Sequence, residues 1–331
     1  MTKSLLWGAA AILGLSAIGC GGSHGSGDGG TSIQPTTGSI VEYTTPTANS
    51  GPTGITTGSD KNIWVLEGSA NKVAQVSVSG TINEFSLPST TVAPSDIVSG
   101  SDGNLWYVDQ SNHLGQVTVF GNVKTFPATF GGLTVGGDDN LWVGEGAGGN
   151  IDVYSTSGAK LHSFTSGTNP AALQIDKMTL GQNGDVWFDT ATDENVVKMS
   201  TTGTSTAYTF SQIPSSNAMQ GITKGPDGNI WFCAQNSNLI GRINSTSGAL
   251  TTFAVPTASA EPYGITAGTD GNLWFTEMAG DKIGRITPSG VITEFPVPTA
   301  NAEPLYITSG PDGNVWFTEN GAGKVAKIHV F

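Results

Sequence analysis

The chain has 331 residues, of which 47 are glycine, and only 12% of its residues are charged. So much glycine, together with many β-branched residues, argues against long helices and favours turn-rich β structure. The formal net charge of −13 excludes a nucleic-acid partner, because proteins that bind nucleic acids need an excess of Lys and Arg against the phosphates.

The first 20 residues predict an export signal of the lipoprotein type. Lys3 provides a positive start, residues 5–18 are apolar, and Ala17-Ile18-Gly19-Cys20 resembles a bacterial lipobox. An apolar run of 14 residues is shorter than the roughly 20 that a membrane-spanning helix needs. We therefore expect lipidation at Cys20 and an extracytoplasmic protein, periplasmic or at the cell surface, that meets the membrane only through this anchor. The alternative is an ordinary cleaved signal.

Residues 21–38 are predicted to be a linker. The stretch GGSHGSGDGGTS that follows Cys20 is rich in glycine and serine, a composition that behaves as a flexible chain. The second cysteine, Cys233, lies inside a strand pattern and is interpreted as a small buried hydrophobe. No disulfide is expected between the two.

The rest of the chain is a repeat built around tryptophan. The spacing between successive tryptophans is 36 to 45 residues, and the positions are Trp64, Trp106, Trp142, Trp187, Trp231, Trp274 and Trp316. Each follows a turn of the kind seen in Asp270-Gly271-Asn272. Asp-Gly and Asn-Gly tolerate the positive φ that tight hairpins need. Each unit therefore contains a hairpin centred at this turn.

One unit shows the complete pattern of four strands. Residues 264–295 read GITAGTDGNLWFTEMAGDKIGRITPSGVITEF, in which GITAG, NLWFTE, KIGRIT and VITEF each predict a short strand. Four antiparallel strands every 36 to 45 residues are typical of a propeller blade.

The ends of the chain predict how the ring closes. The last unit stops after its third strand at residues 327–331, whereas residues 39–44 form a fourth strand with no unit of its own. We therefore predict an all-β, seven-bladed propeller over residues 39–331, in which the N-terminal strand completes the last blade. Closure removes the sheet edges that invite aggregation.

The repeats resemble those of the virginiamycin B lyase (streptogramin B lyase) family. GPDGNIWF, GTDGNLWFTE, DKIGRITPSGVITEFPVPT and EPYGIT carry the resemblance, which covers about residues 39–331. It implies a seven-bladed propeller and a Mg²⁺-dependent carbon–oxygen lyase that opens cyclic depsipeptides by elimination. It also implies catalytic residues at the start of the first strand of a blade: a Tyr in the first blade, a His in the sixth and seventh, and a Glu two residues before the last His.

Most of these catalytic positions hold other residues in this chain. Thr53 occupies the Tyr position, Tyr263 and Leu305 occupy the two His positions, and only the glutamate remains, as Glu303. Leucine accepts no proton, so the family's general base is missing. The histidines at positions 24, 113, 162 and 329 are expected in the linker, in a loop between strands or on outer strands. Glu303 is thus the single catalytic candidate, and Mg²⁺ is expected only if the lyase interpretation holds.

The equivalent positions of all seven blades predict the ligand-facing surface of the ring. They are Thr53, Ser95, Gly131, Asp176, Gln220, Tyr263 and Leu305, with Glu261 and Glu303 just before the last two. This polar and aromatic set suits a neutral, amphipathic or cationic small molecule or peptide better than a phosphate.

Acidic residues also recur at the end of the predicted second strand of the blades: Glu67, Asp109, Glu145, Glu277 and Glu319. One interpretation is an acidic rim that binds a hard cation through oxygen ligands. The favoured one is a set of ion pairs within each blade, because Lys72, Lys282 and Lys324 follow three of the acids by five residues.

These observations predict a monomeric binding module for a small molecule, a peptide or an envelope protein. One alternative is an active lyase, or another lactone- or ester-directed enzyme, with a rearranged site around Glu303, Glu261 and Tyr263. A second alternative is a structural envelope protein without a small ligand.

Overall fold

The computed structural model describes residues 36–146, 148–165, 175–190, 195–210 and 219–331. The predicted signal at 1–20, with Cys20, and the predicted linker up to residue 35 lie outside these ranges. Within them, no helix is long and apolar enough to cross a membrane.

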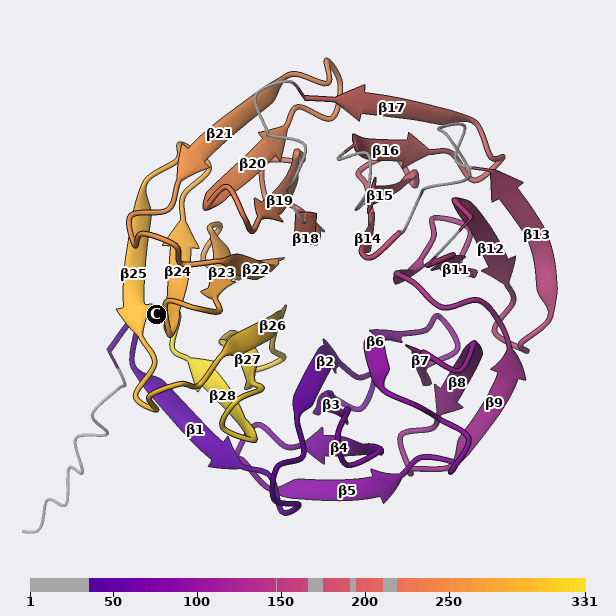
Figure 1. Ribbon diagram of the computed structural model, residues 1–331, viewed down its shortest axis with the longest axis horizontal. Helices are drawn as coiled ribbons and strands as arrows, with labels where there is room; N and C mark the ends of the chain where they lie inside the picture. Colours follow the sequence, from indigo (N-terminus) through magenta and orange to yellow (C-terminus); the bar gives the residue numbers. More distant parts are fainter. Residues whose placement is uncertain (1–35, 147, 166–174, 191–194, 211–218) are drawn as a thin grey trace, which may run out of the picture. The chain divides into compact units, whose positions relative to one another are not determined.

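Seven four-stranded antiparallel sheets form a closed ring over residues 36–331, and this confirms the predicted propeller (Figure 1). The innermost strands are β2 (Pro52–Thr57), β6 (Pro94–Ser99), β10 (Leu133–Val135), β14 (Met178–Leu180), β18 (Met219–Lys224), β22 (Pro262–Ala267) and β26 (Pro304–Ser309). The second strands are β3 (Ile63–Glu67), β7 (Leu105–Asp109), β11 (Leu141–Gly144), β15 (Val186–Thr190), β19 (Ile230–Ala234), β23 (Leu273–Glu277) and β27 (Val315–Glu319).

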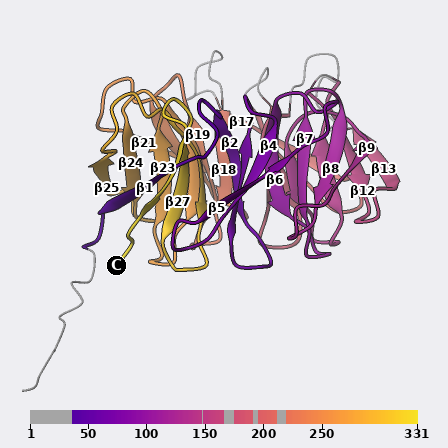
Figure 2. The ribbon, with the colours of Figure 1, turned by 90° about the horizontal axis from the view of Figure 1, so that it is seen from below.

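The two outer strands of each blade complete the sheets, which stand across the thickness of the ring (Figure 2). The third strands are β4 (Lys72–Val76), β8 (His113–Val117), β12 (Asn150–Tyr154), β16 (Asn195–Met199), β20 (Leu239–Ile243), β24 (Lys282–Ile286) and β28 (Lys324–Ile328). The outermost strands are β5 (Ile82–Ser86), β9 (Val123–Pro127), β13 (Lys160–Thr165), β17 (Ser205–Thr209), β21 (Leu250–Ala254), β25 (Ile292–Pro296) and β1 (Ile40–Thr44).

The N-terminal strand closes the ring as predicted. β1 pairs antiparallel with β28, from Ile40 opposite Ile328 to Thr44 opposite Lys324. Strand β28 begins three residues earlier than the sequence pattern indicated and ends at Ile328, so His329 follows it. His113, which was expected in a loop, is the first residue of β8.

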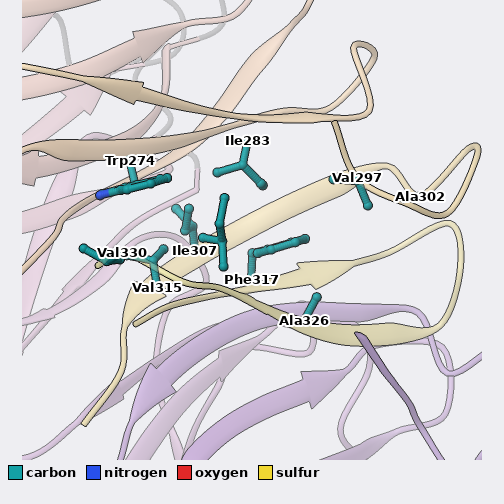
Figure 3. Packing of buried hydrophobic residues seen from close by; sticks show 10 residues of the cluster. Trp274, Ile283, Val297, Ala302, Ile307, Val315, Phe317, Ala326 and Val330 are labelled. Carbon is teal, nitrogen blue, oxygen red and sulfur yellow. The ribbon is translucent and has the colours of Figure 1, made fainter. Parts of the chain in front are cut away.

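The repeated tryptophans hold the blades together. All seven are at most 1% exposed, and each stacks on an aromatic ring of the outermost strand of its blade, as Trp316 does on Tyr43 at 5.6 Å between centroids. Each also faces the next blade: Trp274 of the sixth blade packs with Val315 and Phe317 of the seventh (Figure 3). The core therefore lies between the blades, and no blade buries its own faces alone.

Candidate functional site

In most blades the candidate residue lies in a β-bulge at the start of the innermost strand. In five blades the pairing with the second strand shifts just after the strand begins, for example between Pro262 and Ile265. Such a bulge re-aims the side chains that it contains. The residues inside these five bulges include Thr53, Ser95, Gln220, Tyr263 and Leu305.

A cavity of about 200 Å³ lies where these strands begin, and we call it the mouth chamber. Its lining residues are Ser95, Phe130, Gly131, Asp176, Lys177, Gln220, Tyr263 and Tyr306. Five of them were predicted as ligand-facing from the repeat. The chamber therefore combines three aromatic rings with neutral and charged polar groups.

The side chains of Asp96, Lys177 and Tyr306 meet across the channel, and we call these three the floor of the mouth chamber. The Lys177 Nζ lies 3.4 Å from a carboxylate oxygen of Asp96 and 4.2 Å from the centre of the Tyr306 ring. Tyr306 meets Tyr263 edge to face at 5.4 Å. Lys177 thus ties the fourth blade to the second by an ion pair and to the seventh by a cation–π contact. Below this floor lies a cavity of about 140 Å³ that is lined mainly by aliphatic residues of the innermost strands.

Burial governs the acid–base character of the chamber. Burial, and then the neighbouring Tyr306, raises the pKa of Tyr263, and burial followed by Asp96 raises that of Tyr306. Asp189, behind the floor, accepts a hydrogen bond from the Lys177 backbone N–H at 2.8 Å, and burial raises its pKa well above the usual value. Because their pKa values are raised, Tyr263 and Tyr306 stay protonated near neutral pH and act as hydrogen-bond donors rather than bases.

Four predicted site residues do not line the mouth chamber. Thr53 donates a hydrogen bond to the carbonyl oxygen of Pro94 at 3.1 Å, and the carbonyl oxygen of Leu305 accepts one from Thr276. Glu261 accepts a hydrogen bond from Gln235 at 3.2 Å. Glu303, the catalytic candidate, has a positive φ of 48°; its side chain lies against Gly321, in the turn after β27.

The prediction that Glu67, Glu277 and Glu319 pair with lysines of their own blades is wrong in its partners. The lysines pair instead with glutamates of the outermost strands: Lys72–Glu84 at 2.6 Å, Lys282–Glu294 at 2.8 Å and Lys324–Glu42 at 2.7 Å. The reason is that each lysine also donates to a threonine of the linker that enters its blade, at Thr47, Thr257 or Thr299. The second-strand glutamates stay 0% exposed beneath these contacts. In the second blade, Asp109 does pair within the blade, with His113 at 3.0 Å.

The described residues do not offer the family's base or a metal centre. His113 is held by Asp109, His162 stacks on Phe164 of β13, and His329 follows β28; none of the three lines the mouth chamber. Among the described residues, no three or more His, Cys, Asp or Glu side chains are grouped so as to hold a metal ion. Asp96 is engaged by Lys177, so the donors present near the floor do not fit a Mg²⁺ site.

Three residues of the floor were missed from the sequence. Asp96, Lys177 and Tyr306 directly follow the predicted ligand-facing residues Ser95, Asp176 and Leu305. At the same position the other four blades have Gly54, Gly132, Gly221 and Gly264. The departure from glycine was the available signal, because a side chain at this position projects from the innermost strand where the repeat otherwise has none.

A family profile and a solved structure both match this chain to one family. The sequence profile of the virginiamycin B lyase family matches residues 31–172 and 171–330. A streptogramin B lyase structure is 30% identical, with a TM-score of 0.81, and the match covers 88% of this chain and 98% of that one. No curated protein sequence matches this chain.

Two further structures come from Staphylococcus aureus. Its virginiamycin B lyase is 29% identical, with a TM-score of 0.80, over 88% of this chain and 99% of that one. A catalytically inactive histidine-to-alanine variant of that enzyme, solved with quinupristin, matches with the same identity, TM-score and coverage.

Proposed function

Since the chain belongs to the virginiamycin B lyase family, we propose that it is a ligand-binding propeller that has lost the family's lyase reaction. The main observation behind this proposal is that neither of the two positions at which the family resemblance implies a catalytic histidine holds one. They hold Tyr263 and Leu305, and no described histidine lines the mouth chamber.

The chemistry of the chamber supports binding rather than elimination. Elimination at an ester needs a group that accepts a proton from carbon. Tyr263, with its raised pKa, remains protonated, and the ammonium group of Lys177 is held in an ion pair with Asp96. Glu303, two residues before Leu305, lies outside the chamber lining. The groups that face the chamber are suited to hold a ligand in place.

The lining also indicates the class of ligand. Phe130, Tyr263 and Tyr306 offer aromatic surface, while Ser95 and Gln220 offer neutral hydrogen-bonding groups. A volume of about 200 Å³ is smaller than the roughly 300–1,000 Å³ of a typical small-molecule site. We propose that the chamber receives one aromatic or amphipathic group of a larger ligand, such as a cyclic depsipeptide.

Binding can be tested with quinupristin and residues 31–331, which contain the whole ring. Quinupristin is expected to shift the amide resonances of Ser95, Gln220 and Tyr263 in a saturable way. Tyr263→Ala should weaken this binding at least about tenfold, because a central aromatic contact commonly dominates an interface. Phe120→Ala, which alters a ring that is 82% exposed in the turn between β8 and β9, should leave it unchanged. Equal losses in both variants would refute a site at the mouth.

We also propose that the protein is exported and anchored by a lipid on Cys20, with the ring facing its ligand outside the cytoplasm. The motif at residues 17–20 supports this. Cys20→Ala should move the protein from the membrane to the soluble fraction of cells, because one thioether-linked anchor would then be absent. Membrane fractionation followed by immunoblotting measures the effect, and an unchanged membrane fraction would count against lipidation.

A further inference from the structure

The third blade lacks the cover that the first, sixth and seventh blades have over the end of their second strands. In the first, sixth and seventh blades this strand ends in Glu67, Glu277 or Glu319, each 0% exposed. The entering linker covers each of them, and its threonine bonds to the Lys–Glu pair beside it, as Thr299 does to Glu42 at 2.9 Å. The corresponding acid of the third blade, Glu145, faces a cavity instead.

A shorter linker explains the difference. Eight residues separate the end of the outermost strand from the ligand-facing position in the linkers that enter the first, second, sixth and seventh blades, as between Thr44 and Thr53. Only three residues, 128–130, separate Pro127 from Gly131. The linker that enters the third blade therefore has no counterpart of Thr47, Thr257 or Thr299 with which to cover its acid.

The space left open is a cavity of about 400 Å³, which we call the blade-3 notch. Its lining residues are Asn112, Thr129, Phe130, Glu145 and Gly146. Phe130 also lines the mouth chamber, so the two cavities are adjacent at this residue. Together they reach the size of a typical small-molecule site, which the mouth chamber alone does not.

One polar residue of the notch, Asn112, corresponds to asparagines that hold linkers in other blades. Asn112 precedes the third strand of its blade with a positive φ, as do Asn71 and Asn238. The Asn71 amide donates to the carbonyl oxygen of Pro88 at 3.0 Å, and that of Asn238 donates to Thr257 at 2.8 Å. In the part of the chain that the structure describes, Asn112 bonds to its linker through its backbone, whose carbonyl oxygen accepts from the Ala128 N–H.

Two further groups in the notch have hydrogen-bonding capacity to spare. The Thr129 hydroxyl is buried and has no hydrogen-bond partner among the described residues. One carboxylate oxygen of Glu145 accepts a hydrogen bond from Asn150 at 2.9 Å, and the contacts of the described residues leave the other oxygen free to accept. A buried hydroxyl without a partner is costly, and a ligand that bonds to it would remove that cost.

We propose that the blade-3 notch is a second ligand subsite, which takes an ammonium group carried on an apolar or aromatic arm of the ligand. This rests on the proposed function, since the arm belongs to a ligand whose main group occupies the mouth chamber. Glu145 accepts charge-assisted hydrogen bonds from the ammonium, and the Phe130 face contributes a cation–π contact. The net charge of −13 favours the approach of a cation over that of an anion.

The benzylammonium ion at pH 7 is the probe for this subsite, with residues 31–331 and amide resonances as the readout. We expect saturable shifts centred on Asn112, Phe130 and Gly146. Glu145→Gln should weaken binding about tenfold, because a neutral amide replaces the charged acceptor. Asp139→Asn makes the same change of charge at an exposed turn of the same blade and should have no effect. Benzyl alcohol, which lacks the charge, should bind much more weakly.

The outcomes for the notch and for the mouth are separable. Tyr263→Ala should weaken quinupristin binding at least about tenfold and leave benzylammonium binding intact. Benzylammonium shifts that are absent, that lie elsewhere, or that persist unchanged in Glu145→Gln overturn the subsite, even where quinupristin still binds. Quinupristin that fails to bind while benzylammonium binds at Glu145 overturns the mouth proposal instead. The melting temperature of each variant shows whether it is folded, and Thr129→Val provides a second, conservative change within the notch.

Discussion

Three buried glutamates are the most unusual residues of the repeat. Glu67, Glu277 and Glu319 are 0% exposed, and no described residue donates a hydrogen bond to either carboxylate oxygen of Glu67 or Glu319. Burial, and then the nearby Glu42, raises the pKa of Glu319 to about 8, although Lys324 lowers it; Asp281 adds to the rise. Burial likewise raises the pKa of Glu67 and of Glu277 to about 7.

These pKa values predict that stability falls as pH rises from about 4.5 to about 8. Below this window both the folded and the unfolded chain hold the protons, and above it both have lost them. Within it the unfolded chain has lost protons that the folded protein keeps, so the folded state is progressively disfavoured. The loss should be on the order of 10 kcal/mol for the three groups together.

Replacing the glutamates tests this reasoning. The melting temperature of Glu319→Gln should fall less between pH 5 and pH 8 than that of the wild type, and the triple variant with Glu67→Gln and Glu277→Gln should fall least. Asp139→Asn, which changes an exposed acid, serves as the control. A triple variant with the same pH dependence as the wild type would show that these carboxyls do not titrate in the window.

At the level of the element, β1 is the strand on which ring closure depends. It contributes five paired positions to the last blade, the Glu42 partner of Lys324 and the Tyr43 ring that stacks on Trp316. Its removal would expose one edge of β28 and leave Lys324 without a carboxylate partner. Closure of a propeller makes this a cost for the whole ring and not for one blade.

Truncation measures that cost. We expect the chain 47–331, which lacks β1, to melt more than about 10 °C below the chain 35–331, since strand pairing, stacking and an ion pair are all lost. The chains 21–331 and 35–331 should melt together, because both keep β1. Circular dichroism on heating gives the three values; equal melting temperatures for 35–331 and 47–331 would contradict the role assigned to β1.

The linkers between blades show how far the sequence could lead at this scale. The gap of 36 residues between Trp106 and Trp142 is the shortest in the series, so a shortened third unit was visible. Its consequence was not, because the covering role of the linkers is carried by Thr47, Thr257 and Thr299, whose partners lie far along the chain. Only the folded ring shows that the missing residues open the blade-3 notch.

For the whole molecule, the repeat specified the fold far better than the site. Blade number, strand order and closure follow from turns and tryptophans that recur locally. The ligand-facing residues Ser95, Gln220 and Tyr263 were found because the repeat aligns them. Lys177 was not, because its contacts with Asp96 and Tyr306 cross the channel between three blades, and no local pattern records a contact across a channel.

The most direct test of the account is whether the ring converts a family substrate. Residues 31–331 would be incubated with quinupristin and Mg²⁺ and followed by liquid chromatography and mass spectrometry, with a known streptogramin B lyase as the positive control. We expect unchanged quinupristin, because Tyr263 and Leu305 provide no base for elimination. A new peak of the same mass would mean that the ring is opened by elimination, and would contradict the assignment of this propeller as a binding protein without lyase activity.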